Sequence, residues 1–299
     1  MSLKVTGITK KYGEQIALDQ VSFEIAKGEI VGFLGPNGAG KSSLMKILTT
    51  YLQADAGQAY VNGDDVTLHP KKVQSAVGYL PEHNPLYLDL YVREYLQFNA
   101  SIYRVSKARI EEVIQLTGLS PEAHKKIGQL SKGYRQRVGI ASALLHDPEI
   151  LILDEPMTGL DPNQMIEIRQ LIKSAGKNKT VFLSTHIMQE VEAICNRVII
   201  INHGKIVTDK QIDQLQEVDT LVLEVELDQE VAETFWNNLS NLMDYRQVSP
   251  KQFLLSFPAE SDYRASVFDY AQANGLRILQ LTQKTKDLES IFHELTQKA

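Results

Sequence analysis

The feature that most constrains the fold of this chain is a glycine-rich loop between an apolar run and a predicted helix. The apolar run is Ile30–Leu34, and we expect the helix over 42–52. Glycines let such a loop turn its backbone N–H groups toward an anion, and the helix adds its positive N-terminal end. The pattern G-x-x-x-x-G-K-[ST] is satisfied by Gly35, Pro36, Asn37, Gly38, Ala39, Gly40, Lys41, Ser42 and Ser43. The sequence therefore predicts a phosphate-binding loop, because a chance glycine-rich turn would not need this strand and helix around it.

Two side chains of this loop carry the expected chemistry. Lys41 is predicted to reach the β- and γ-phosphates of a nucleoside triphosphate, and Ser42 to offer its hydroxyl to Mg²⁺. The remaining loop residues are predicted to bind the nucleotide.

A second apolar run, Ile150–Leu153, ends in two consecutive acids. Asp154, at the predicted strand end, can hold Mg²⁺ through water. Glu155 can polarise a water molecule for in-line attack on the γ-phosphate. A surface turn would explain one acid at this place, but two acids downstream of a phosphate-binding loop favour a catalytic site.

Strands and helices alternate along this part of the chain. Apolar runs at 181–183 and 198–201 follow the two above, with predicted helices at 163–174 and 187–195 between them. This order predicts an α/β fold with a mostly parallel core sheet covered on both faces, preceded by antiparallel N-terminal strands. A helical insertion over about 83–147, with helices at 92–104, 107–117 and 131–147, is expected between the first and second core strands.

The pattern changes after about residue 218, which suggests two domains, 1–218 and 219–299. We expect a polar, helical linker over 205–219. The order strand, helix, strand, strand, helix, strand, helix then predicts a small α+β domain of the ferredoxin-like type. Its expected segments are 220–227, 229–238, 243–249, 252–257, 261–273, 276–282 and 287–297.

Composition narrows the possible partners. The formal net charge is −6, so no basic field suits a nucleic acid backbone, and we expect no nucleic acid partner. The single cysteine, Cys195, excludes an internal disulfide framework, and both it and Trp236 are expected to pack in the interior. No apolar run is long enough to span a bilayer, and no secretory signal is visible. We therefore expect a cytosolic protein whose membrane role, if it has one, comes through a partner.

The segment Leu130-Ser131-Lys132-Gly133-Tyr134-Arg135-Gln136-Arg137 resembles the signature sequence of ABC ATPases. In that family the segment opens a helix whose N-terminus caps the γ-phosphate of ATP held by the opposite subunit. Ser131 and Gly133 match the key serine and the second glycine. Lys132 replaces the usual first glycine, and Tyr134 the usual glutamine.

Four further positions match this family. Tyr12 matches the aromatic residue that stacks on adenine, and Asp161 belongs to a loop that signals across the dimer. His186 matches the histidine that contacts the γ-phosphate. Glu82 falls where most members have a glutamine that orients water or metal. The resemblance implies a P-loop NTPase of the ABC ATPase type, with ATP and Mg²⁺ as its cofactors and Glu155, His186 and Lys41 as its catalytic residues.

The resemblance also implies partners. ABC ATPases of this kind dimerise around two ATP molecules and drive a separate integral-membrane permease, which places them on the inner face of the cell membrane. The tail over 287–295 is similar to that of ATPases serving ABC-2-type exporters, and overall the chain resembles the gliding-motility ABC ATPases of Bacteroidetes. The family uses the region 83–98 as a groove for a permease helix, and its tyrosines Tyr87, Tyr91 and Tyr95 favour a contact site there.

Two alternatives belong to other classes of protein. A soluble ABC ATPase acting on ribosomes usually carries two ATPase halves, and one acting on chromosomes inserts a long coiled coil between the two motifs; neither is visible here. A GTPase would need a guanine-reading Asn-Lys-x-Asp, but Asn178-Lys179-Thr180 continues to Val181. A small-molecule kinase would not need the Ser131–Gly133 element.

Overall fold

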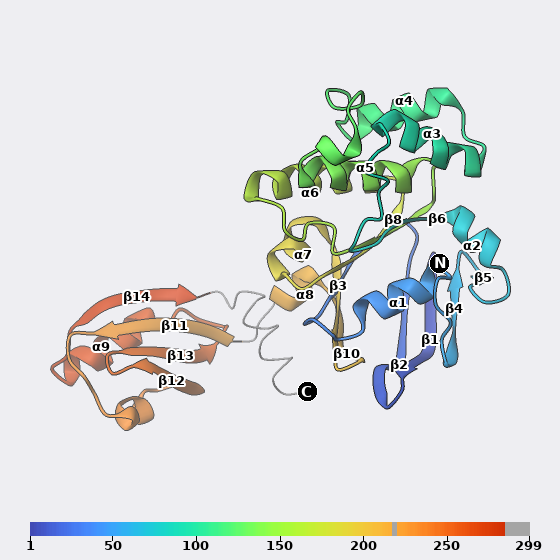
Figure 1. Cartoon of the computed structure of the whole chain (residues 1–299). Helices are drawn as coiled ribbons and strands as arrows, with labels where there is room; N and C mark the ends of the chain where they lie inside the picture. The colour runs from blue at the N-terminus through green and yellow to red at the C-terminus, as the bar shows by residue number, and fades with distance from the viewer. Residues whose placement is uncertain (217–219, 285–299) are drawn as a thin grey trace. The chain divides into compact units, whose positions relative to one another are not determined.

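The computed structural model describes residues 1–216 and 220–284 of the 299-residue chain (Figure 1). The chain divides into two compact units, of which unit 1 covers Met1–Ile212 and unit 2 begins at Asp213. Our domain boundary at residue 218 stays a prediction. The predicted helix 287–297 and the tail resemblance lie outside the described residues.

The centre of unit 1 is a six-stranded sheet in the order β10-β9-β3-β8-β7-β6, parallel except for the edge strand β10. Its inner strands are continuous apolar runs that are buried almost throughout, as expected of parallel strands covered on both faces. The mostly parallel P-loop fold expected from the sequence is therefore confirmed. The strands span Ile30–Leu34 (β3), Val77–Leu80 (β6), Ile150–Asp154 (β7), Thr180–Thr185 (β8), Arg197–Asn202 (β9) and Lys205–Gln211 (β10).

Two features of this sheet differ from the sequence expectation. The strand β6 is a short fifth parallel strand that we did not predict. The helical insertion therefore lies between the second and third parallel strands along the chain, β6 and β7, rather than between the first and second. The predicted helical linker is wrong over Lys205–Gln211, which pairs with β9 as an antiparallel strand before the short helix α8 (Ile212–Gln216). β10 and β6 form the two edges of the sheet.

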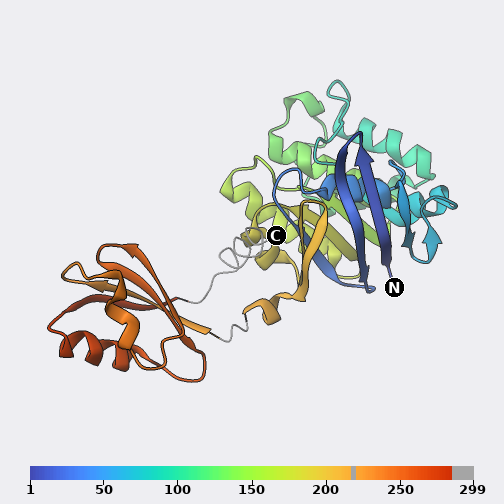
Figure 2. The ribbon, with the colours of Figure 1, turned by 90° about the horizontal axis from the view of Figure 1, so that it is seen from below.

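A second, antiparallel sheet has the order β2-β1-β4-β5. Figure 2 shows β1 and β2 as two long strands side by side, with the helix α1 behind them. Apolar side chains from these strands, from α1 and from the parallel sheet form one buried core, in which the rings of Phe23, Phe33 and Phe182 pack together. The elements are β1 (Leu3–Tyr12), β2 (Gln15–Ile25), α1 (Lys41–Leu48), β4 (Ala56–Val61) and β5 (Asp64–Asp65).

The insertion is helical, as predicted, and its three α-helices lie together at the top of unit 1 in Figure 1. They are α3 (Val92–Tyr103), α4 (Lys107–Leu116) and α5 (Lys132–Leu144), with the 3-10 turn η1 (Ile127–Gln129) before α5. The other helices of unit 1 are α2 (Pro70–Ala76), α6 (Pro162–Gly176) and α7 (Met188–Ile194).

Unit 2 has one antiparallel sheet in the order β12-β13-β11-β14, which is the order of a ferredoxin-like domain. Its own core surrounds the fully buried Trp236. The first predicted helix of this unit is only the 3-10 turn η2, so its extent over 229–238 is wrong. The elements are β11 (Thr220–Leu227), η2 (Glu233–Asn238), β12 (Asp244–Ser249), β13 (Gln252–Pro258), α9 (Arg264–Ala273) and β14 (Ile278–Lys284).

Within the described residues, no helix combines the length and the apolar character that a membrane crossing requires.

Candidate functional site

The glycine-rich loop connects the end of β3 to the start of α1, as predicted. Gly40 has φ +107°, and a Cβ at this position would stand 2.3 Å from the carbonyl oxygen of Ala17. A Cβ at Gly35 would stand 2.3 Å from the carbonyl oxygen of Ile201. Glycine is therefore required at both ends of the loop, where neighbouring strands approach its backbone.

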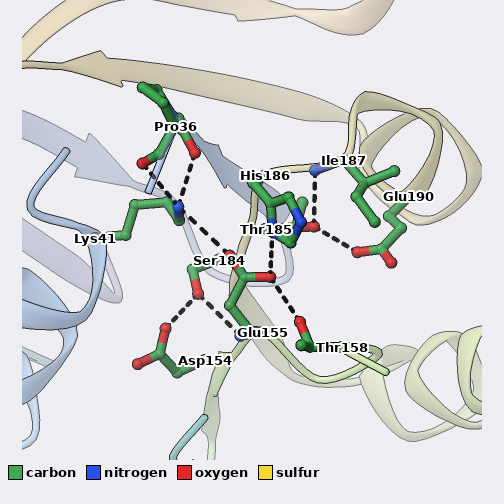
Figure 3. A network of polar contacts seen from close by, with 11 residues as sticks. Pro36, Lys41, Asp154, Glu155, Thr158, Ser184, Thr185, His186, Ile187 and Glu190 are labelled. Carbon is green, nitrogen blue, oxygen red and sulfur yellow. Dashed lines mark hydrogen bonds and ion pairs between the residues drawn. The ribbon is translucent and has the colours of Figure 1, made fainter. Parts of the chain in front are cut away.

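Lys41 is the buried cation of this loop. Its side chain is 6% exposed, and its Nζ donates to the carbonyl oxygens of Gly35 (2.7 Å) and Pro36 (3.2 Å). It also forms an ion pair with Glu155 Oε1 at 3.4 Å (Figure 3). A charge this deeply buried needs such partners, and the two carbonyls hold the ammonium at the mouth of the loop.

A cavity of about 380 Å³ opens beside the loop. Tyr12, at the end of β1, stands at its rim with 49% of its surface exposed, and its hydroxyl lies 3.4 Å from Ser43 Oγ. An exposed aromatic ring at one end and a cation at the other suit a nucleotide with its base and its phosphates. The lining residues are Tyr12, Gln15, Ala17, Asn37, Gly38, Gly40, Lys41, Ser42, Ser43, Glu82 and Glu155. Gln15 and Ala17 belong to no sequence motif, although Gln15 pairs directly with Tyr12 in the β1–β2 register.

Asp154 is the last residue of β7 and Glu155 follows it, and the neighbouring strand β8 positions both. The hydroxyl of Ser184, on β8, donates to Asp154 Oδ1 and accepts the backbone N–H of Glu155 at 3.0 Å. Asp154 and Ser184 are buried almost completely. Ser184 has no expected role from the sequence, although it stands at the end of an apolar run directly before Thr185 and His186.

Glu155 is held by three side chains. Its Oε2 accepts hydrogen bonds from Thr158 Oγ1 (3.0 Å) and His186 Nδ1 (2.9 Å), while Oε1 faces Lys41 (Figure 3). Its backbone has φ +49°, a left-handed conformation that is unusual for a residue other than glycine. Strain of this kind is found where a side chain must be aimed at a particular place, here the wall of the phosphate cavity.

His186 directly follows β8, and its two neighbours in the chain are held by hydrogen bonds to each other and to α7. Thr185 Oγ1 donates to the buried carboxyl of Glu190, on α7, and accepts the backbone N–H of Ile187 at 3.1 Å. Burial raises the pKa of Glu190 above its ordinary value of 4.5, and the nearby Glu155 raises it further. The loop that carries His186 is therefore fixed to the first turn of α7.

The oxygen groups at this site suit Mg²⁺. Ser42 offers a hydroxyl, and Asp154 and Glu82 offer carboxylates; Ser42 and Glu82 line the cavity, and Asp154 lies directly before Glu155. The described residues include no cluster of three His, Cys, Asp or Glu side chains that could hold a metal by themselves. Mg²⁺ is commonly bound by one or two carboxylates together with substrate phosphates and water.

The predicted signature residues lie elsewhere on unit 1. Ser131 caps α5, with its hydroxyl accepting the N–H of Tyr134 at 3.3 Å, and Asp161 caps α6 in the same way, accepting the N–H of Gln164 at 3.0 Å. Gly133 is buried beneath the side chain of Gln164. Ser131, Gly133 and Asp161 are not among the described residues that line the phosphate cavity. One chain therefore brings together the loop, the acids and His186, but not the signature residues.

The region 83–98 presents a partly exposed aromatic face. Tyr87 and Tyr91 are exposed, but Tyr95 is only 7% exposed, so its predicted place on a contact surface is wrong. Tyr95 lies on the inner side of α3 and packs edge-on against Tyr87, at 6.1 Å between ring centroids. Phe98 and Ile102, on the same helix, are exposed instead.

Comparison with known proteins extends this description. Residues 18–158 match the ABC transporter family, and residues 126–192 match an AAA domain described as a putative AbiEii toxin of a type IV toxin–antitoxin system. The bacitracin transport ATP-binding protein of Bacillus licheniformis is 35% identical over 98% of this chain and 96% of its own length. The Nod factor export ATP-binding protein I of Rhizobium sp. (strain N33) is 30% identical over 99% of this chain and 97% of its own.

A solved structure agrees with the fold of unit 1. A dimeric ATP-binding cassette in a post-hydrolysis state with ADP and Pi has a TM-score of 0.65 and 28% identity; the match covers 70% of this chain and 98% of that one. The loop, the paired acids and the serine-capped helix are thus found in a chain that is similar over nearly its whole length to ATP-binding proteins of transporters. The chain belongs to the ATP-binding subunits of ABC transporters.

Proposed function

We propose that this chain hydrolyses ATP to drive a membrane exporter, with Glu155 as the general base. The observation that carries this proposal is the setting of Glu155. The carboxylate lines the phosphate cavity, its backbone is fixed by Ser184, and its oxygens face Lys41, Thr158 and His186. A base held this way can orient a water molecule toward the terminal phosphate.

The other side chains of the site have three further roles: they balance phosphate charge, orient Glu155 and hold Mg²⁺. Lys41 and the N–H groups of the loop balance the charge that develops on the transferring phosphoryl group. His186 lies within hydrogen-bond reach of Glu155 and orients it. Ser42, Asp154 and Glu82 would hold Mg²⁺, which when bound neutralises phosphate charge.

The site needs a second copy of the chain. Ser131 and Gly133 open α5, whose N-terminus offers N–H groups and a positive dipole to an anion, yet they do not line the cavity of their own chain. We therefore place them, with Asp161, against the nucleotide bound by the partner subunit. The dimeric cassette with ADP and Pi supports this arrangement.

Export is supported by the relatives named for bacitracin transport and Nod factor export. The permease is a separate integral-membrane chain, and the ATPase sits on the inner face of the membrane through it. The exposed aromatic face at Tyr87 and Tyr91 is the proposed permease contact. The gliding-motility assignment remains a finer prediction within this branch.

The central test is Glu155→Gln. The amide keeps the shape of the side chain but cannot accept a proton, so ATP still binds while turnover falls about 10²–10⁴-fold. ATP should then trap the variant as a dimer, measured by size-exclusion chromatography with light scattering alongside the hydrolysis rate. Glu14→Gln, at an exposed turn, is the matched control and should hydrolyse ATP at the wild-type rate.

Unchanged hydrolysis by Glu155→Gln would remove Glu155 from this role. A pull-down from cells distinguishes a transporter subunit from a soluble ABC ATPase. Recovery of an integral membrane protein with the chain supports the transporter subunit. Recovery of ribosomes or DNA and of no integral membrane protein contradicts it.

A further inference from the structure

The helix α5 has a buried glycine in its interior, Gly139, at a place where the helical backbone does not require one. Its φ is not positive, and a glycine inside a helix is less favourable than an alanine. Two side chains of another segment account for it. A Cβ at Gly139 would stand 2.0 Å from Asn84 Nδ2 and 2.6 Å from Leu80 Cδ1. Gly139 therefore provides the space in which both side chains rest.

The Asn84 amide is bonded to α5 at this place. Asn84 Nδ2 donates to the carbonyl oxygen of Arg135 at 3.2 Å. In an α-helix the same carbonyl accepts the N–H of the residue four positions ahead, here Gly139, and its oxygen has a second lone pair for the amide. The amide reaches a carbonyl inside the helix because residue 139 has no side chain.

Leu80 and Asn84 are the two ends of a short segment that carries Glu82 in its middle. Leu80 is the last residue of β6, and Glu82 lines the phosphate cavity. Within the described part of the chain, the exposed side chain of Glu82 makes no hydrogen bond or ion pair. The direction of its carboxylate therefore depends on the backbone of this segment, which rests on α5 at both ends.

We propose that Asn84 is a positioning residue for Glu82: its amide, seated at Gly139, fixes the backbone that carries this carboxylate and so sets where it meets Mg²⁺. The inference rests on the role of Glu82 in the proposed function. Asn84 is not among the described residues that line the phosphate cavity, so it acts through the backbone. A nucleotide with Mg²⁺ then depends on the amide and its seat, whereas a metal-free nucleotide does not.

Two substitutions disturb this contact from opposite sides. Asn84→Ala removes the amide, and Gly139→Ala adds the methyl group that would meet it. Alanine is the better helix former, so an effect of Gly139→Ala does not arise from a weaker helix propensity. In the double variant the methyl group has no amide to displace, so we expect the double variant to behave like Asn84→Ala alone.

The chain contains a matched control for the loss of an amide. Asn99 Nδ2 donates to a helix carbonyl as Asn84 does, that of Tyr95 in α3, at 2.8 Å. Asn99 is not among the described residues that line the phosphate cavity. Asn99→Ala should therefore bind nucleotide and hydrolyse ATP as the wild type does.

The first experiment measures binding of the non-hydrolysable nucleotide AMPPNP by calorimetry, in excess Mg²⁺ and in EDTA. In Mg²⁺, Asn84→Ala and Gly139→Ala should bind about tenfold more weakly than wild type, the effect typical of a group that orients a metal ligand. In EDTA, all of these proteins should bind equally, because the phosphate-binding loop is unchanged. Glu82→Ala, in the same assay, measures the full effect of losing the carboxylate.

The second experiment measures steady-state hydrolysis across a Mg²⁺ titration. Asn84→Ala should need about tenfold more Mg²⁺ for its half-maximal rate, and its kcat should approach that of the wild type at saturating Mg²⁺. A general structural defect would instead lower kcat at every Mg²⁺ concentration. In the nucleotide-free protein, hydrogen exchange over Glu82–Asn84 should be faster in Asn84→Ala than in wild type or Asn99→Ala.

The outcomes separate this inference from the proposed function. If Glu82→Ala binds the magnesium nucleotide as tightly as wild type, the proposed role of Glu82 is contradicted. If Glu82→Ala binds it more weakly but Asn84→Ala and Gly139→Ala do not, the positioning role of Asn84 is wrong. Additive losses in the double variant would overturn the seat at Gly139. Thermal unfolding checks that each variant is folded.

Discussion

At the scale of single residues, the site depends on one buried hydroxyl. Ser184 connects the carboxylate of Asp154 to the backbone N–H of Glu155. Asp154 has almost no exposure to water, so the hydroxyl replaces part of the hydration that the acid loses. The two acids are adjacent in sequence, but a residue of the neighbouring strand sets their relative positions.

Ser184→Ala should therefore weaken catalysis more than ATP binding. Outer-shell hydrogen bonds of this kind are typically worth about 10–100-fold in activity or metal affinity. We expect a loss of that size in kcat and a higher Mg²⁺ requirement, measured by hydrolysis rates across a Mg²⁺ titration. Ser174→Ala, which removes a hydroxyl bonded only to the Leu171 carbonyl of its own helix, should leave both unchanged. Wild-type Mg²⁺ dependence in Ser184→Ala would contradict the assignment.

At the scale of elements, β8 and α7 together hold the loop that carries His186. The hydroxyl of Thr185 and the carboxyl of Glu190 are both buried and bonded to each other. Burial and the nearby Glu155 raise the pKa of this carboxyl, whereas the hydrogen bond from Thr185 and the charges of Arg169 and His186 lower it. Burial is the largest of these effects, so the pKa of Glu190 is raised in the fold.

This carboxyl gives a pH dependence with a definite sign. Its folded pKa is raised, so its contribution to stability is fully present below pH 4.5 and is lost as pH rises through the folded pKa. Glu190→Gln stays neutral and can still accept from Thr185. We expect the variant to gain stability relative to wild type as pH rises from 5 to 9, measured by urea unfolding. A constant difference between the two across this range would show that the pKa of Glu190 is not raised in the folded protein.

At the scale of the whole molecule, the two units have separate cores. The core of unit 1 joins both of its sheets to α1, and that of unit 2 surrounds Trp236. The residues that line the phosphate cavity all belong to unit 1. The dimeric cassette covers 70% of this chain and nearly all of its own, so such a cassette exists without a second unit of this length.

Removal of residues 213–299 should accordingly preserve the nucleotide site. We expect ATP affinity within about twofold of the full chain, since distant, independent parts of a protein contribute nearly additively. Fluorescent nucleotide titration measures this, and thermal unfolding checks that the shortened protein is folded. A folded, shortened protein that no longer binds ATP would show that unit 2 contributes to the site.

The sequence by itself determined the parts of this protein that depend on local chemistry. A strand, a glycine-rich loop and a helix in succession predict the phosphate site, and the apolar runs that end at Asp154, Glu155 and His186 predict the strand ends beside it. The helix caps at Ser131 and Asp161 are also local, because each side chain accepts an N–H three residues ahead.

Only the tertiary structure decided features that depend on distant contacts. The strand β6 is too short for a distinct apolar run, and its Gly78 is required because α5 approaches it: a Cβ there would stand 2.2 Å from the carbonyl of Ala143. Tyr95 resembles its exposed neighbours in sequence but faces inward. Lys132 meets Gly159 only because two helix starts pack together. The pattern of a sequence shows only which neighbours a residue has along the chain. The strand β6, the burial of Tyr95 and the position of Lys132 depend instead on which distant residues the fold places against them.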